Sequence, residues 1–171
     1  MNLAQRITAP AEGHDAALEP QTRSQIEDLV GLGQLKPGFR ALFSGPPGTG
    51  QTPAAALLGK AAGLPVFRID LSQVFPEWTE ETEQSLASLF AQAEFQGWVL
   101  FFDEADLLFD KRTESRNASD RAANQQIAYL LQRIEDFPGI VILAADLRSH
   151  LDEAFVRRFQ HQQVLHFPLP G

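Results

Sequence analysis

The sequence has no cysteine among its 171 residues. It therefore has no disulfide framework, no thiolate metal site and no cysteine nucleophile. No apolar run reaches the roughly 18 residues that a membrane-spanning helix needs. The first 20 residues also lack the apolar run of a secretory signal. These absences fit a reducing compartment and favour a cytoplasmic address without membrane attachment.

Positive charge is scarce as well. The chain has 14 Lys and Arg residues against 22 Asp and Glu residues, which gives a formal net charge of −8 at pH 7. Proteins that bind nucleic acid present a basic face that displaces counterions from the phosphates. Anionic membrane surfaces attract basic segments in the same way. We therefore expect neither a nucleic acid nor a membrane as the partner.

What the chain does contain is an alternation of strand-like and helix-like segments. Short apolar runs predict buried strands over residues 39–44, 66–70, 98–102, 140–145 and 164–167. Helical spacing predicts one helix before these strands, over about 22–35 with Thr22 at its capping box, and further helices between them. This pattern predicts an α/β fold of three layers, with a five-stranded parallel sheet covered by helices on both faces. We expect residues 1–21 to form an extended arm, with one short strand near Ile7, and 22–171 to form one domain.

A loop rich in Gly and Pro joins the first of these strands to the next helix. It reads Gly45-Pro46-Pro47-Gly48-Thr49-Gly50-Gln51-Thr52. In a phosphate-binding loop, glycines let backbone N–H groups turn toward the phosphates, and the helix N-terminus adds positive potential. Thr52 is placed to ligate Mg²⁺, but position 51 holds Gln where the pattern requires Lys. Taken alone, the segment is therefore also compatible with an ordinary strand-to-helix turn.

A second signal lies at the end of the predicted strand 98–102, where Asp103 and Glu104 follow an apolar run. Parallel sheets bind ligands at the carboxyl ends of their strands. Asp103 is placed to hold Mg²⁺ through water, and Glu104 to orient or deprotonate an attacking water. The alternative for this pair is a solvated strand end.

These segments, taken in order, resemble the AAA family of P-loop ATPases over about residues 15–170. The resemblance rests on GPPGTGQT at 45–52, LFFDEAD at 100–106, VILAAD at 141–146 and LDEAFVRRF at 151–159. Within the family, the chain is most similar to the AAA ATPases found beside contractile injection systems. The resemblance implies a sheet with the strand order 5-1-4-3-2 and a site for ATP or ADP with Mg²⁺. It also implies a homo-oligomeric ring and a protein substrate.

The resemblance further implies roles for residues outside the loop. Arg157 and Arg158 match the arginines that reach the nucleotide of a neighbouring subunit; the alternative for each is an ordinary surface arginine. Trp78, in a predicted pore loop, would grip a threaded chain, unless it is partly buried against its own domain. Asp146 stands at the polar sensor position, where Asn is typical. We expect the family's helical lid to be absent from this chain.

Two departures from the family pattern act in the same direction. Gln51 removes a positive charge from the nucleotide site, and Asp146 adds a negative one. Losing one charge-assisted hydrogen bond costs roughly 1.5–3 kcal/mol. The sequence therefore predicts an AAA-type domain that couples ATP binding and hydrolysis to remodelling of a protein partner, with impaired hydrolysis. The alternative is a catalytically inactive assembly or scaffold module. A small P-loop kinase is a third hypothesis, but no second basic cluster supports it.

Overall fold

A computed structural model describes residues 2–8, 20–33, 35–46, 48, 50–109, 118–146 and 163–166. Its strands are β1 (Gln5–Ile7), β2 (Arg40–Ser44), β3 (Val66–Asp70), β4 (Val99–Asp103), β5 (Val141–Ala145) and β6 (Gln163–His166). Its helices are α1 (Pro20–Gly31), α2 (Gln51–Ala62), α3 (Leu71–Val74), the 3-10 turn η2 (Phe75–Glu77), α4 (Glu80–Gln96), α5 (Asp106–Phe109) and α6 (Ala118–Asp136). No helix in these ranges is long and apolar enough to cross a bilayer.

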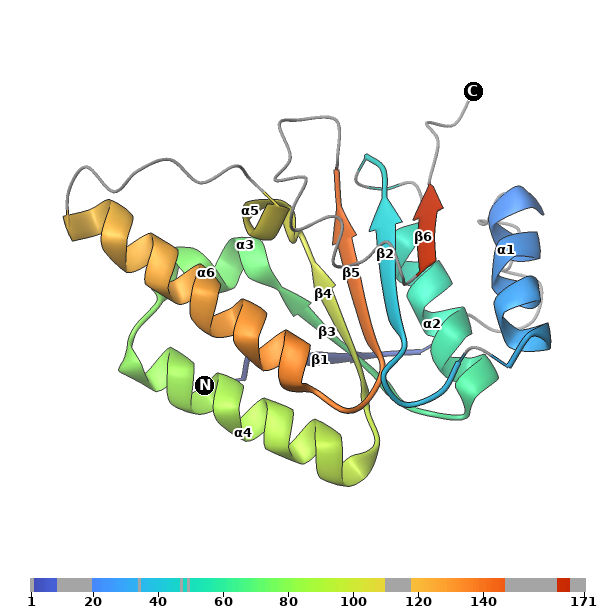
Figure 1. Ribbon diagram of the computed structural model, residues 1–171, viewed down its shortest axis with the longest axis horizontal. Coiled ribbons are helices and arrows are strands. Elements are labelled where there is room, and N and C mark those ends of the chain that lie inside the picture. Colours follow the sequence, from blue (N-terminus) through green and yellow to red (C-terminus); the bar gives the residue numbers. More distant parts are fainter. Residues whose placement is uncertain are drawn as a thin grey trace.

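Within the described residues, the sheet has six strands in the order β1-β3-β4-β5-β2-β6 (Figure 1). The last five of these are parallel, and their order is the predicted 5-1-4-3-2 read in reverse. The prediction of a sheet with only five parallel strands is corrected at one edge. The short strand expected near Ile7 pairs antiparallel with β3, so that Ile7 lies opposite Val66. Part of the N-terminal arm therefore belongs to the sheet and covers an edge that would otherwise leave backbone groups unpaired.

The central strands are buried on both faces, because their successive side chains enter two separate cores. In β4, Leu100 and Phe102 enter one core, and Val99 and Phe101 enter the other. Helices α4 and α6 cover the first face of the sheet, and α1 and α2 cover the second (Figure 1). The sheet is thus the middle of three layers, as predicted.

Of two threonines near helix starts, one caps its helix and the other, which the sequence predicts as a cap, does not. Thr79 caps α4: its side chain accepts from the backbone of Thr82, whose hydroxyl in turn accepts from the Thr79 N–H. Helix α1, in contrast, begins at Pro20, so Thr22 lies inside the helix and is buried rather than capping it. Proline suits the first helical position because that residue needs no N–H bond, which lets the helix begin earlier than the Thr22 pattern indicates.

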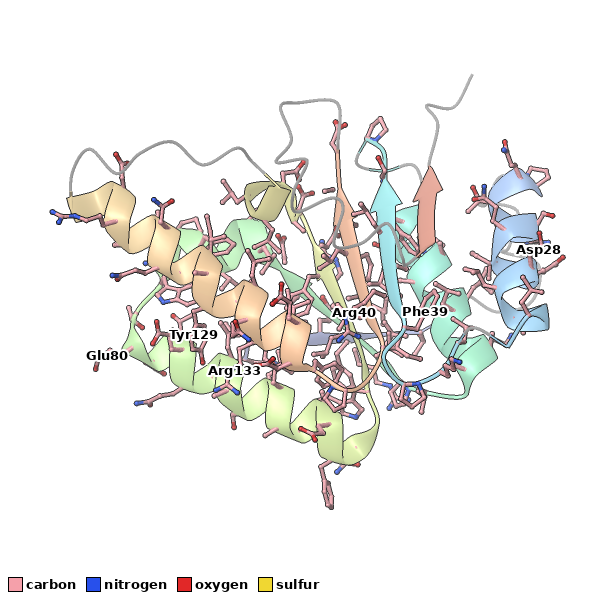
Figure 2. All side chains as sticks on the ribbon, in the orientation of Figure 1. Asp28, Phe39, Arg40, Glu80, Tyr129 and Arg133 are labelled. Atoms are coloured by element: carbon pink, nitrogen blue, oxygen red, sulfur yellow. The ribbon has the colours of Figure 1, made fainter. Side chains whose placement is uncertain are left out.

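Arg40, the first residue of β2, is a buried cation that holds the turn between α6 and β5. Its Nη1 donates to the carbonyl of Gly139 at 2.7 Å, and its Nη2 donates to those of Ile134 at 3.0 Å and of Phe137. Figure 2 shows Arg40 near the C-terminal end of α6. The last carbonyls of a helix have no intrahelical donor, so the guanidinium satisfies them from a strand. Burial lowers the pKa of Arg40.

We expect Arg40→Ala to lower the free energy of unfolding by about 2–4 kcal/mol, because several buried carbonyls lose their donor. Arg40→Lys should recover part of this loss, since an ammonium can reach some of the same oxygens. Urea denaturation measures both, with the exposed α6 residue Arg121→Ala as the control. Equal stability of the Arg40→Ala and Arg121→Ala variants would contradict the capping role.

Gly59 lies where α2 crosses closest to β3. A Cβ built there would lie 2.1 Å from Val66 Cγ2 and 3.0 Å from the Leu64 carbonyl. Alanine is usually about 1 kcal/mol better than glycine in a helix, but such an overlap costs about 1–3 kcal/mol. We therefore expect Gly59→Ala to lower the melting temperature. Gly31→Ala, at the open end of α1 with nothing within 4 Å of its Cβ position, should leave the melting temperature unchanged or raise it.

Candidate functional site

A cleft of about 390 Å³ opens at the carboxyl edge of the sheet. Figure 1 shows this edge at the top, where β2 and β5 end. The wall of the cleft brings together the predicted phosphate loop, the acidic end of β4 and the end of β5. The lining residues are Gly45, Gly48, Gly50, Gln51, Thr52, Pro53, Arg68, Asp103, Glu104, Asp106, Ala144, Ala145 and Asp146. Of the predicted site residues, Pro47, Thr49, Arg157 and Arg158 lie outside the described residues.

The loop after β2 has the backbone that close approach to a ligand requires. Gly48 and Gly50 have φ values of 80° and 103°, a region that residues with a Cβ rarely adopt. Gly50 is the N-cap of α2, and Thr52 is the second residue of that helix. The Gly45 N–H donates to the Ala145 carbonyl at 3.1 Å, which fixes the start of the loop to the end of β5. The loop therefore directs the N-terminus of α2 into the cleft.

Gln51 lines the cleft, but its side-chain amide is bonded to the backbone of the loop. Its Nε2 donates to the carbonyl oxygens of Pro46 at 2.9 Å and of Gly45 at 3.2 Å. Only 7% of the residue is exposed. The side-chain amide is thus engaged by the loop's own backbone, where it satisfies two carbonyls and supplies no charge to a ligand.

The acidic side of the cleft is tied together by backbone hydrogen bonds. The Ala105 N–H donates to the Ala144 carbonyl at 2.9 Å, and the Asp146 N–H donates to Asp106 Oδ1 at 2.9 Å. These bonds link the ends of β4 and β5, so Asp146 lies in the same wall as Asp103. Asp106 was not predicted as a site residue, although it is the last letter of the LFFDEAD segment.

Glu104 is held in an unusual position in this wall. Its φ is 55°, in the left-handed region, and its N–H donates to Asp103 Oδ1 at 2.8 Å. The pKa of Glu104 is raised, first by burial and then by the nearby Asp103, Asp106 and Asp70 carboxylates. Arg68 opposes this rise. Glu104 therefore binds a proton more readily than an exposed glutamate does.

Arg68 on β3 is the functional residue that the sequence analysis missed. Its Nε donates to Asp103 Oδ2 at 2.8 Å, and its Nη2 lies in ion-pair contact with the same oxygen at 2.7 Å and with Asp70 Oδ2 at 3.8 Å. The register of β3 against β4 pairs Asp70 with Asp103, and this places Arg68, two residues earlier, on the same face. The polar alternation Arg68-x-Asp70 on a strand predicted to lie beside β4 was the available signal.

Trp78 packs against its own domain, which is the alternative reading of the predicted pore loop. It is partly buried, its ring stacks on Phe75 with the centroids 5.6 Å apart, and it meets Tyr129 edge-on at 6.0 Å. Its Nε1 donates to Glu83 Oε1 at 3.3 Å. These contacts hold the indole between η2, α4 and α6, so it is not presented for gripping another chain.

The chemical groups that line the cleft are of the types that bind a nucleotide with Mg²⁺. Glycine backbone and a helix N-terminus suit phosphate oxygens. Mg²⁺ usually takes one or two protein oxygens together with phosphates and waters, and the Thr52 hydroxyl and the Asp103 carboxylate both line the cleft. Among the described residues, no three His, Cys, Asp or Glu side chains could hold a metal ion by themselves. A metal here would therefore depend on the phosphates for further ligands.

The model of the AAA family, the ATPase family associated with various cellular activities, matches residues 41–167. The chain belongs to this family. An uncharacterized AAA family ATPase of Sinorhizobium fredii, y4kL, is 36% identical over 138 residues, which cover 80% of this chain and 41% of that protein. Fidgetin-like protein 1 of Caenorhabditis elegans is 32% identical over 161 residues, which cover 86% of this chain and 27% of that protein. This AAA chain therefore spans less than half the length of either relative.

Solved AAA structures confirm the fold. The crystal structure of the FIGL-1 AAA domain in complex with ADP superposes with a TM-score of 0.66 at 25% identity, covering 99% of this chain and 59% of that one. A second FIGL-1 AAA domain structure gives a TM-score of 0.73 at 23% identity, covering 99% and 58%. The α/β architecture expected of an AAA domain is thus shown.

The raised pKa of Glu104 predicts a pH-dependent effect of Glu104→Gln. A carboxyl whose pKa is higher in the folded state than in the unfolded state destabilises the fold once the pH exceeds the folded pKa, but not below the unfolded value of about 4.3. The variant should therefore raise the melting temperature at neutral pH and leave it nearly unchanged at about pH 4. Thermal melts over this range test it, with the exposed α1 residue Glu27→Gln as the control. A gain that is the same at both pH values would refute the electrostatic origin.

Proposed function

We propose that this chain is the nucleotide-binding part of an AAA protein that binds ATP or ADP in the cleft and hydrolyses ATP slowly. One observation carries the proposal: the phosphate loop and the Asp103-Glu104 pair line a single cleft, while the amide of Gln51 is engaged by the loop itself. The cleft keeps the groups that bind phosphate but lacks the lysine charge that normally accompanies them.

Each residue of the cleft has a separate part in this proposal. Backbone N–H groups of the loop 45–50 and the N-terminus of α2 bind the phosphates. Thr52 and Asp103 are the residues that would hold Mg²⁺, which when bound offsets phosphate charge. Glu104 would orient the attacking water. Asp146, at the sensor position, would repel the terminal phosphate rather than donate to it.

The charge in the cleft supports slow hydrolysis. Among the described residues of the cleft, four carboxylates line the wall, at Asp103, Glu104, Asp106 and Asp146, and Arg68 is the one basic side chain. In a partly dehydrated cleft, like charges repel more strongly than on an open surface. The triphosphate would therefore bind less tightly, and the charge that develops during its cleavage would be stabilised less well.

Coupling to a protein partner rests on the family. Relatives of this chain include fidgetin-like protein 1 and a protein named cell division protein C in Sulfolobus acidocaldarius. We include in the proposal that the chain acts on a protein substrate within a homo-oligomeric ring, where Arg157 and Arg158 reach the nucleotide of a neighbour. Association with a contractile injection system stays a prediction from the sequence. The scaffold alternative is favoured by the engagement of Gln51 together with Asp146 in the cleft.

Restoring the lysine tests the proposal directly. We expect Gln51→Lys to tighten Mg·ATP and Mg·ADP binding by about 10- to 200-fold, the range of a charge-assisted hydrogen bond. Calorimetric titration measures the affinity, and a phosphate-release assay measures turnover. Gln96→Lys, at the exposed end of α4, adds the same charge away from the cleft and should change neither.

The slow ATPase and the scaffold module predict different rates of phosphate release for Gln51→Lys. Tighter binding with faster phosphate release in Gln51→Lys indicates an ATPase weakened chiefly at position 51. Tighter binding without turnover supports the scaffold module. Rapid turnover by the unaltered chain would refute the impaired site, and no nucleotide binding by either protein would refute the nucleotide-binding function.

A further inference from the structure

Among the described residues that line the cleft, Arg68 is the only basic one. It comes from β3, not from the loop 45–52, so it is unrelated to the position of the missing lysine. About 26% of its side chain is exposed. The positively charged side chain of this cleft therefore lies on the side of the acidic wall and not on the side of the loop.

Arg68 occupies the carboxylate that would otherwise serve a metal. Asp103 Oδ2 accepts from Arg68 Nε at 2.8 Å and pairs with Arg68 Nη2 at 2.7 Å, and Asp103 Oδ1 accepts from the Glu104 N–H at 2.8 Å. Both oxygens of the carboxylate thus already have donors. A guanidinium at this distance offsets the charge of the carboxylate and also repels a divalent cation placed beside it.

The same guanidinium has donors to spare. Its Nε and Nη2 face Asp103, and its Nη1 has no hydrogen-bond partner in the part of the chain that the structure describes. Arginine presents five N–H groups in a planar fork that matches the spacing of phosphate oxygens. The loop glycines 48 and 50 and Thr52 line the same cleft as this fork. One side chain can therefore satisfy Asp103 and meet a phosphate.

We propose that Arg68 determines how far this site depends on metal: it takes the place of Mg²⁺ at Asp103, so that a nucleoside diphosphate binds through arginine with little help from the cation. The inference rests on the proposed nucleotide binding and specifies how the charge of the phosphates is balanced. It assigns to β3 the cationic role that the loop 45–52 lacks.

Titration of the fluorescent ADP analogue mant-ADP, in EDTA and in excess MgCl₂, tests the proposal. The chain as given should bind mant-ADP in the two media with affinities within about threefold, less than one charge-assisted hydrogen bond contributes. Arg68→Gln should lose about tenfold or more of the affinity in EDTA, and MgCl₂ should restore most of it because Asp103 becomes available. Lys60→Gln, on the exposed last turn of α2, removes one charge outside the cleft and should behave as the unaltered chain does.

Asp103→Asn gives the opposite signature. It removes the expected metal ligand but releases Arg68, so affinity in EDTA should stay equal or rise, and MgCl₂ should add nothing. Thermal melts without nucleotide show whether each variant is folded. If Arg68→Gln unfolds, the double variant Arg68→Gln/Asp103→Asn, which removes the charge of Asp103 together with that of Arg68, replaces it and should also lose affinity in EDTA.

Three results would overturn the proposal. Equal binding of mant-ADP in EDTA by Arg68→Gln, or by the double variant, and by the unaltered chain would remove the arginine from the site. Binding by the unaltered chain only when MgCl₂ is present would refute metal independence and leave the proposed nucleotide binding intact. Absence of binding in both media would refute the proposed function itself, and the role of Arg68 with it.

Discussion

The register between β3 and β4 is the constraint on which the site depends. It pairs Asp70 with Asp103, and the two-residue period of a strand then turns Arg68 toward the same carboxylate. A shift by one residue would move Arg68 to the other face of the sheet and leave Asp103 beside other carboxylates without its cation. The two buried cores oppose such a shift, because the side chains that fill one core would have to move into the other.

The phosphate loop keeps its shape without the lysine through contacts of its own. The start of the loop is fixed to β5 through Gly45, and its carbonyls are satisfied by Gln51. The backbone that faces a phosphate is therefore organised before any ligand arrives, which lowers the entropic cost of binding. The loop therefore has the backbone shape that phosphate binding requires, but Gln51 leaves it without the positive charge of a lysine. The usual P-loop sequence supplies both the backbone shape and a lysine charge. In this cleft the loop supplies the shape, and the positive charge comes from Arg68 on β3.

The sequence was sufficient to predict the elements and site residues that depend on a local pattern. Apolar runs predicted the strands, the family resemblance implied their order, and the loop and the Asp103-Glu104 pair were placed on the correct elements. It did not predict contacts between residues that are far apart in the sequence. Arg68 is 35 residues from Asp103, so its role follows only from the register. Thr22 misled because Pro20 begins α1 earlier, and the orientation of Gln51 depends on carbonyls that no motif specifies.

Charge balance rather than fold therefore distinguishes the two candidate functions. An ATPase must stabilise negative charge that grows on the phosphates during cleavage, and preorganised donors or cations supply that stabilisation. A scaffold needs only the resting charge of a bound nucleotide to be offset. Arg68 is already paired with Asp103 and can offset the charge of a bound nucleotide. To stabilise the additional charge of the transition state, it would have to give up part of its interaction with Asp103. On the proposed function, we expect a cleft with this arrangement to retain a nucleotide more readily than it cleaves one, so that slow turnover follows from the Arg68–Asp103 pair.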